Sequence, residues 1–260
     1  MTTELLASLA LQFELPRPSI AVERVDPRSP MRWEHRAERW LYPASMIKTP
    51  LAAVTVLLLA RGELDERSAI PVAASNLTAT DGATPLDSGY RASLDELLAL
   101  SVERSDNVAF NQLLDVVGRE RAGRLVREEL GLRATGLRRK LSGGDRLLVD
   151  PLQTGRNTHP ARDANRLFAA IARESFPGAA RLRAYLDRQQ WNTKLSRGLR
   201  AGDRFAHKTG DTSATSHDGG ILLTAEGTCY ALTVYTALPA GPDADTRLGA
   251  FMQALRSELP

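Results

Sequence analysis

Apolar residues recur at two different spacings along the chain, and the spacing changes twice. Outside residues 44–202, alternation of apolar and polar positions predicts strands over 19–25, 31–41, 220–223 and 229–237. Within that stretch, a period of about 3.6 predicts helices over 46–60, 94–104, 107–117, 121–130, 161–173 and 179–190. The same helical spacing near the chain ends predicts helices over 3–14 and 243–257.

Strands near both chain ends, with helices between them, predict the α+β class in the form of an α/β sandwich. The simplest arrangement is one antiparallel sheet built from both ends and flanked by the terminal helices. An all-helical domain is then inserted between the second and third strands. We therefore expect a discontinuous sheet domain, 1–43 plus 204–260, a helical domain, 44–203, and an active site where the two meet.

Composition narrows the class of protein. The chain has 260 residues, of which 43% are apolar and 25% charged, as in soluble globular proteins and unlike disordered or collagen-like chains. The 34 basic and 31 acidic residues are interspersed, so a nucleic-acid partner is not indicated. The longest apolar run, 51–60, is about half the length of a membrane span and predicts a buried helix instead. We expect a monomer that acts on a small molecule.

Rare residue types direct attention to a few positions. The four lysines are Lys48, Lys140, Lys194 and Lys208, and a site that needs an amine able to lose its proton must use one of them, because arginine cannot. The single cysteine, Cys229, lies in an apolar stretch and is expected to be a buried structural thiol. The histidines, His35, His159, His207 and His217, lack paired metal-ligand spacing, so neither a metal nor a cofactor is expected.

Ser45 and Lys48 lie where a predicted strand gives way to the apolar helix. Residues three apart share a helix face, so the hydroxyl and the amine are within reach of each other. Desolvation and the positive end of the helix dipole lower the pKa of a lysine there, and the free N–H of Ser45 could donate to an oxyanion. By itself, Ser-x-x-Lys also fits a helix cap with a lysine that extends to solvent.

Two further motifs fall at element boundaries. Ser105-Asp106-Asn107 lies between two predicted helices, where its hydroxyl could relay a proton and its amide could hold a lysine and a substrate carbonyl, although it also fits an ordinary helix N-cap. Lys208-Thr209-Gly210 precedes the last strands. Its charge and hydroxyl suit a carboxylate, and a glycine at a sheet edge permits close approach of a substrate, although a Thr-Gly turn is the alternative.

Each motif occurs once, and their order resembles that of the penicillin-binding protein and class A β-lactamase superfamily. The resemblance extends over nearly the whole chain, through Arg39-Trp-Leu-Tyr-Pro-Ala-Ser-Met-Ile-Lys48, Asn157-Thr-His-Pro-Ala-Arg-Asp163 and the pair His207-Lys-Thr-Gly and His217-Asp-Gly-Gly. It implies Ser45 as the acylated nucleophile, Lys48 as its base and Ser105 as the donor to the leaving nitrogen. It also implies a substrate-amide contact at Asn107, a carboxylate side formed by Lys208, Thr209 and Gly210, and an oxyanion hole formed by the N–H groups of Ser45 and Asp211.

One position departs from the class A pattern. The glutamate of the Ω-loop, the base for deacylation in that class, is replaced by Leu141, and no glutamate occurs between Glu129 and Glu174. Asp150 could replace it only if the loop were rearranged. Without a base, acylation can proceed while hydrolysis of the acyl-enzyme slows.

The leading hypothesis is a serine hydrolase that acts through an acyl-enzyme on β-lactams or similar amides and esters. If hydrolysis were efficient, the resemblance would imply β-lactam catabolism and antibiotic resistance. A D-alanyl-D-alanine carboxypeptidase or an esterase is one alternative, and a non-catalytic protein that binds cell-wall fragments or lactams is another. A binder would not need all of Ser45, Lys48, Ser105 and Lys208. Residues 1–15 lack the basic segment of a secretory signal, so the protein is expected to be cytoplasmic as written or exported with its signal removed.

Overall fold

A computed structural model describes residues 2–25, 31–144 and 147–259. Within these residues, five strands form an antiparallel sheet in the order β2-β1-β7-β6-β5. Their bounds are β1 (Ser19–Arg24), β2 (Met31–His35), β5 (Arg204–Thr212), β6 (Thr215–Leu223) and β7 (Cys229–Thr236). The first strand pairs with the last, with Ile20 opposite Val234, so both chain ends build the sheet. The predicted α+β class is confirmed.

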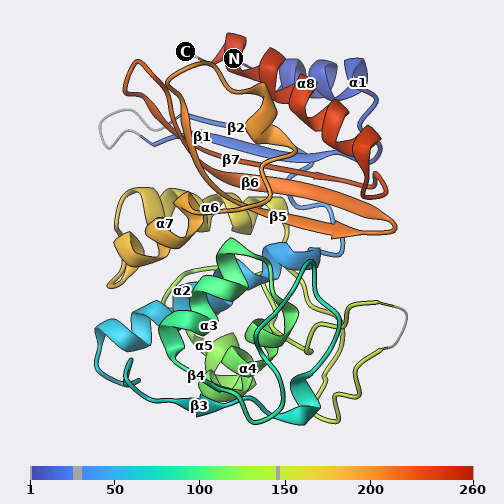
Figure 1. The fold of residues 1–260 in the computed structure, drawn as a ribbon. Coiled ribbons are helices and arrows are strands. Elements are labelled where there is room, and N and C mark those ends of the chain that lie inside the picture. The colour runs from blue at the N-terminus through green and yellow to red at the C-terminus, as the bar shows by residue number, and fades with distance from the viewer. Residues whose placement is uncertain (1, 26–30, 145–146, 260) are drawn as a thin grey trace.

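The two faces of the sheet are covered by different helices (Figure 1). On one face lie α1 (Thr3–Gln12) and α8 (Pro242–Glu258), whose apolar side chains form a core with those of β1 and β7. On the other face, α6 (Ala161–Ala172) contacts β1, β6 and β7, and α7 (Ala179–Asp187) contacts β5. Burial of these apolar faces supplies the main drive for the layered packing.

The remaining helices form a second layer below α6 and α7 in Figure 1. They are α2 (Lys48–Ala60), α3 (Leu94–Glu103), α4 (Asn107–Val117) and α5 (Arg119–Glu128), with a small sheet of β3 (Ile70–Pro71) and β4 (Arg91–Ala92). Short 3₁₀ segments occur at η1 (Ala44–Ile47), η2 (Ala74–Asn76) and η3 (Leu195–Gly198). Residues 48–58 of α2 are buried, as its apolar run predicts. No helix in the described part of the chain is long and apolar enough to span a membrane.

The sequence prediction is incomplete at the sheet edges. Strand β5 is not among the predicted strands, β6 is predicted only over 220–223, and β2 ends at His35 instead of residue 41. Nearly all of β6 is buried on both faces, and β5 is buried at its centre over polar residues, so neither strand alternates between apolar and polar residues. The turn expected at 26–30 lies outside the described residues. The domain boundaries at 43/44 and 203/204 stay a prediction.

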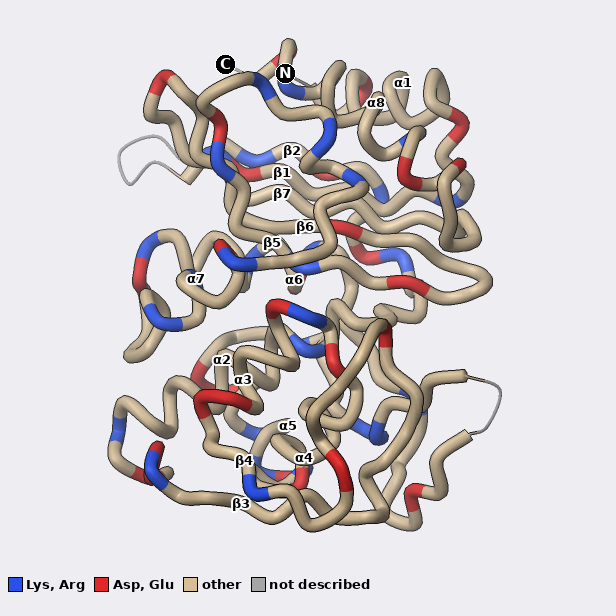
Figure 2. Tube along the Cα trace, in the orientation of Figure 1, with Lys and Arg blue, Asp and Glu red and all other residues tan. Residues whose placement is uncertain are grey.

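Charged residues of both signs are spread along the described part of the trace (Figure 2). Cys229, at the start of β7, is half-buried rather than fully buried, because it packs at the margin of the larger core. Burial raises the pKa of its thiol, which keeps the thiol protonated at neutral pH.

Candidate active site

The three motifs meet at one point between the sheet and the lower helices. Ser45 lies in η1, Lys48 begins α2, Ser105 precedes α4, and Lys208 lies in the edge strand β5. The Nζ atom of Lys48 is 2.8 Å from Ser45 Oγ and 3.1 Å from Ser105 Oγ. The Nζ atom of Lys208 is 2.9 Å from the same Ser105 Oγ. Two hydroxyls and two amines therefore form one continuous hydrogen-bonded chain.

The segment that carries Ser45 is fixed against the sheet by two contacts. A Cβ atom at Gly210 would lie 3.0 Å from the carbonyl oxygen of Pro43 and 3.0 Å from Met46 Cγ. The glycine thus lets β5 pack against η1. His217 of β6 lies 2.9 Å from the carbonyl oxygen of Tyr42 through Nε2, while its Nδ1 accepts from the N–H of Thr236 at 3.2 Å.

Burial lowers the pKa of His217 to about 4, so this ring is neutral at pH 7. Since Nδ1 accepts a hydrogen bond, the proton lies on Nε2 and is donated to Tyr42. His217 therefore ties β6 to the chain just before Ser45.

Two non-glycine residues of the site have left-handed backbone conformations. Ala44, next to Ser45, has φ 48°, and Ser105 has φ 61°. Such conformations are uncommon for residues with a Cβ atom and persist where the surroundings hold them. At Ser105, the next residue supplies that support, because Asp106 caps α4 by accepting from the N–H of Ala109 at 2.9 Å. Asp106 is therefore the N-cap, and the neighbouring Ser105 faces the two lysines.

The environment of Lys48 favours a neutral amine. Its side chain is fully buried, and burial, followed by the nearby charge of Lys208, lowers its pKa well below the usual value. The two N–H groups of a neutral Lys48 amine can donate to two oxygens that only accept hydrogen bonds. These are the Ser105 carbonyl oxygen at 2.5 Å and Asn107 Oδ1 at 2.8 Å. The remaining lone pair can then accept a proton from a hydroxyl, and Ser45 Oγ lies within reach.

Lys208 is also fully buried. Burial, and then the positive charge of Lys194, lower its pKa to about 7. Its Nζ donates to Ser105 Oγ and, at 2.9 Å, to the carbonyl oxygen of Thr209. Near neutral pH this amine can therefore exchange a proton with Ser105.

An open cavity of about 330 Å³ adjoins these residues. Five of the eight residues singled out by sequence line it, namely Ser45, Ser105, Thr209, Gly210 and Asp211, whereas Lys48, Asn107 and Lys208 are not among its lining residues. The cavity is also lined by residues that no motif indicated, among them Asp81, Trp191, Lys194 and Asp245. For Lys194 the rarity of lysine is a usable signal, since three of the four lysines lie in this region. Asp81, Trp191 and Asp245 lie in loops or at the start of a helix, where no sequence motif indicates them.

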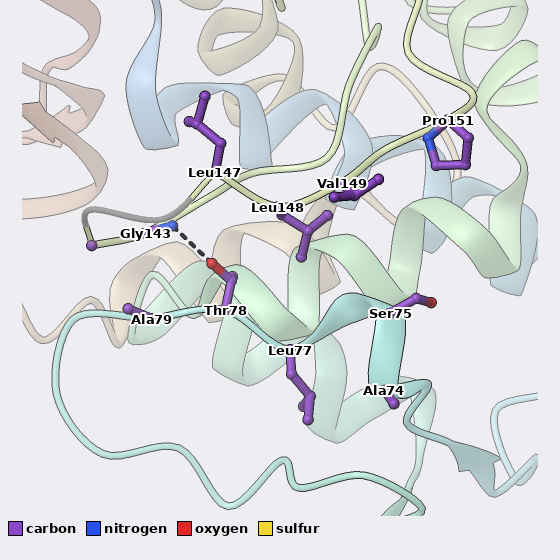
Figure 3. A pocket seen from close by; sticks show the side chains of 11 residues that line it. Ala74, Ser75, Leu77, Thr78, Ala79, Gly143, Leu147, Leu148, Val149 and Pro151 are labelled. Atoms are coloured by element: carbon purple, nitrogen blue, oxygen red, sulfur yellow. Dashed lines mark hydrogen bonds between the residues drawn. The ribbon is translucent and has the colours of Figure 1, made fainter.

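A larger cavity of about 700 Å³ lies beside the site, between residues 74–79 and 143–151. Its walls are mostly apolar and include Leu77, Leu147 and Val149 (Figure 3), and none of the described residues that line it has a titratable side chain. It borders the site at Gly143, where a Cβ atom would lie 2.0 Å from the carbonyl oxygen of Ala79. The hydroxyls and amines that can exchange protons adjoin the smaller cavity.

The loop that carries Leu141 is held by buried polar side chains. Asn111 binds the backbone of Leu141 on both sides, accepting from its N–H at 2.7 Å and donating to its carbonyl oxygen at 2.9 Å. Asn157 likewise accepts from the N–H groups of Arg138 and Arg139. These hydrogen bonds of Asn111 and Asn157 do not involve the side chain of Leu141, which is buried.

Asp150 is occupied elsewhere in the same loop. Its two carboxylate oxygens accept from the Arg119 guanidinium at 2.9 and 2.8 Å, and Oδ2 accepts from the N–H of Lys140 at 2.7 Å. These bonds outweigh its burial and lower the pKa of its carboxyl group. In this loop geometry the carboxylate of Asp150 is engaged by Arg119, so its role as a replacement for the missing glutamate stays a prediction that requires a rearranged loop.

Replacement of Asp150 by asparagine is expected to lower the free energy of unfolding by about 3 kcal/mol, because the largely buried Arg119 guanidinium loses its charge partner. The deacylation rate should change less than about twofold. Urea unfolding measures the first quantity and decay of the acyl adduct measures the second. A deacylation rate that falls tenfold or more would return Asp150 to a catalytic role.

The described residues hold no group of three or more His, Cys, Asp or Glu side chains that could bind a metal. The hydroxyls of Ser45 and Ser105 and the buried amines in contact with them can carry out proton transfer and nucleophilic attack.

Solved structures share this fold over almost their entire length. PBP-A matches with a TM-score of 0.85 and 20% identity, over 99% of this chain and 97% of that one. A β-lactamase from Sphaerobacter thermophilus DSM 20745 matches with a TM-score of 0.81 and 23% identity, over 98% of both chains. A β-lactamase from Xanthomonas campestris pv. campestris matches with a TM-score of 0.83 and 22% identity, over 98% of this chain and 97% of that one. A search of curated protein sequences finds no match.

The fold is the one that these β-lactamases and PBP-A share, and within it the three motifs come together at one cavity. The model of the β-lactamase enzyme family matches residues 6–256, and the chain belongs to that family.

Proposed function

We propose that the protein is a serine hydrolase in which Ser45 is acylated by a β-lactam or a similar amide or ester, and in which the acyl-enzyme is released slowly. The observation that carries this proposal is the 2.8 Å contact between Ser45 Oγ and Lys48, a fully buried lysine with a lowered pKa. Membership of the β-lactamase family supports it. So does the solved acyl-enzyme complex of a leucine-to-glutamate variant of PBP-A with penicillin G, whose fold matches at a TM-score of 0.83.

Acylation would begin when Lys48 Nζ takes the hydroxyl proton of Ser45 and Oγ bonds to the substrate carbonyl carbon. The N–H groups of Ser45 and Asp211 would stabilise the resulting oxyanion. When the intermediate collapses, the carbon–nitrogen bond breaks and the nitrogen takes the hydroxyl proton of Ser105. Lys48 or Lys208 then returns a proton to Ser105, since both amines lie within 3.1 Å of its Oγ.

Deacylation needs a base that removes a proton from the attacking water. Leucine at position 141 supplies none, and Asp150 is engaged by Arg119. We therefore expect the acyl-enzyme to accumulate.

An intact-mass time course with benzylpenicillin tests the proposal. The expected result is an adduct of one penicillin per chain, attached to the peptide that contains Ser45. The lifetime of this adduct should be many times longer than the turnover time of an efficient β-lactamase. Hydrolysed drug without an adduct would mean that deacylation is fast and that an unrecognised base exists. Intact drug without an adduct would overturn the lactam proposal and favour the peptidase, esterase or binding alternatives.

Replacement of Leu141 by glutamate is expected to accelerate decay of the adduct by about 100-fold, a typical gain from a positioned general base. The backbone at this position is already fixed by Asn111, and burial raises the pKa of a carboxyl group toward the range that suits a base. Decay is followed by mass after excess penicillin is removed. Leu141→Gln is the matched control, and equal acceleration by both variants would show that loosening of the loop is responsible.

The pH dependence of acylation is expected to report on Lys48. Only the unprotonated amine accepts the Ser45 proton, so the rate should rise with pH and then level off. The charge of Lys208 lowers the pKa of Lys48, so Lys208→Gln should shift this rise to higher pH. Lys140→Gln is the control, because it removes a lysine charge that is paired with Asp115. It should leave the pH dependence of acylation unchanged. An unchanged profile in Lys208→Gln would contradict the coupling of the two lysines.

A further inference from the structure

Lys194 and Asp211 form an ion pair inside the cavity that contains Ser45. Lys194 precedes η3, its side chain is only 3% exposed, and its Nζ also lies 3.3 Å from the carbonyl oxygen of His217. Asp211, the residue after Gly210 in β5, receives a second hydrogen bond at its other oxygen, from Ser216 Oγ at 2.9 Å. Both oxygens of this carboxylate are therefore bound by the protein itself.

The arrangement is the one in which a substrate carboxylate would be bound, with one oxygen on an ammonium group and the other on a hydroxyl. It lies on the side of the cavity formed by Thr209 and Gly210, where the resemblance places the substrate carboxylate. Among the described residues that line the cavity, Lys194 is the sole basic one. Lys208 is fully buried, is not a lining residue, and donates to Ser105 and to the Thr209 carbonyl oxygen.

Two further carboxylates line the same cavity, Asp81 and Asp245. An anionic group entering it would meet three aspartates and a single lysine that already has an acidic partner. A cavity with this excess of negative charge selects against an anionic ligand, has little effect on a neutral one and favours a cationic one.

We propose that Asp211 fills the carboxylate subsite and makes the enzyme select acyl donors that carry no carboxylate beside the scissile bond, such as neutral esters and amides. This inference rests on the proposed acylation of Ser45. Asp211 is a specificity determinant through its side chain, whereas its backbone N–H belongs to the expected oxyanion hole.

Benzylpenicillin and its methyl ester provide a matched pair of probes, because they differ only in the carboxylate. The second-order rate constant for acylation of Ser45 is measured with each probe by intact mass, for the wild type and for Asp211→Asn. The ratio of the acid rate to the ester rate should rise at least tenfold in Asp211→Asn, because Lys194 is then free to bind the acid. Intrinsic differences in reactivity between the probes cancel when this ratio is compared between variants.

Asp245→Asn is the control, since it removes one negative charge from the same cavity at a residue that does not contact Lys194 in any described bond. An equal rise of the ratio in Asp245→Asn would overturn the subsite assignment and leave only a general charge effect. Asp211→Ser removes the same charge with a smaller side chain, and thermal unfolding of each variant verifies that it is folded. A ratio that stays unchanged in both folded Asp211 variants, while Ser45 is acylated, overturns the inference and leaves the proposed function intact.

If neither probe acylates Ser45 in any variant, the proposed function fails, and binding decides the subsite separately. In the Ser45→Ala background, Asp211→Asn should strengthen equilibrium binding of benzylpenicillin at least tenfold and change binding of the ester much less. Equal effects on both probes would overturn the subsite assignment.

Discussion

Replacement of Ser45 by alanine is expected to abolish covalent labelling by benzylpenicillin, with a fall in the acylation rate of about 10⁴-fold or more. The variant removes the oxygen that bonds to the carbonyl carbon. It also removes the hydroxyl that lies 2.8 Å from Lys48 Nζ and gives up its proton in the acylation step. Intact-mass spectra over several hours, with the fold verified by thermal unfolding, measure the effect. The loss should occur with the penicillin and with its neutral methyl ester alike.

Ser105→Ala is the informative comparison for that experiment. It removes a second hydroxyl of the same cavity but leaves both Ser45 and Lys48, so labelling should persist at a rate about 100-fold lower, as for the loss of a proton relay. Persistent labelling of Ser45→Ala, with the adduct mapped to another residue, would show that the nucleophile has been misassigned. Complete loss in Ser105→Ala alone would point to Ser105 as that residue.

The motif residues were predictable because their chemistry is local. Ser45 and Lys48 are three residues apart where a helical segment begins, and a sequence pattern can state that spacing. Their proximity to Ser105 and Lys208 was predictable only through the resemblance, because contacts between residues 57 and 103 positions apart in the chain are set by tertiary packing. Most of the helices were predictable for a similar reason, since they have one apolar face against a core, whereas α2 was recognised by its continuous apolar run.

The rest of the site depends on tertiary contacts that produce neither a motif nor a hydrophobic periodicity in the sequence. Strand β5 carries His207, Lys208 and Thr209 at buried positions where an ordinary strand would present apolar residues, so these site residues remove the apolar pattern that predicts a strand. The partner of Asp211 is Lys194, which lies in a loop with no motif. The same holds for Asn111, whose two hydrogen bonds fix the backbone at Leu141. The sequence shows that Leu141 stands where the class A pattern has a glutamate, and the structure shows that Asn111 holds the backbone there.

A shared electrostatic arrangement connects these residues. Three lysines lie within one buried region, and their mutual repulsion adds to desolvation in lowering the pKa values of Lys48 and Lys208. Asp211 offsets this by pairing with Lys194. The ion pair therefore has two effects, because it limits the positive charge felt by Lys208 and occupies the position where a substrate anion would bind.

Replacement of Lys48 by arginine is expected to slow acylation of Ser45 by about 10³-fold or more, which lies within the range contributed by a general base. Arginine keeps the positive charge and the hydrogen-bond donors, but it cannot lose a proton at neutral pH, so the Ser45 hydroxyl has no base. Rapid-quench mass spectrometry with benzylpenicillin measures the rate. The same substitution at Lys140, which pairs with Asp115 away from the cavity, should leave it unchanged.

A larger, permanently charged side chain at a fully buried position can also disturb the fold. Lys48→Met separates the two causes, because methionine fills a similar volume without charge and without a basic nitrogen. Both variants should lose acylation to the same extent, and the small residual rate should no longer rise with pH through the range in which the wild type gains activity. A folded Lys48→Met protein that acylates at close to the wild-type rate would exclude Lys48 as the base. Ser105 and Lys208 would then be the remaining route for the proton, since their 2.9 Å contact is independent of Lys48.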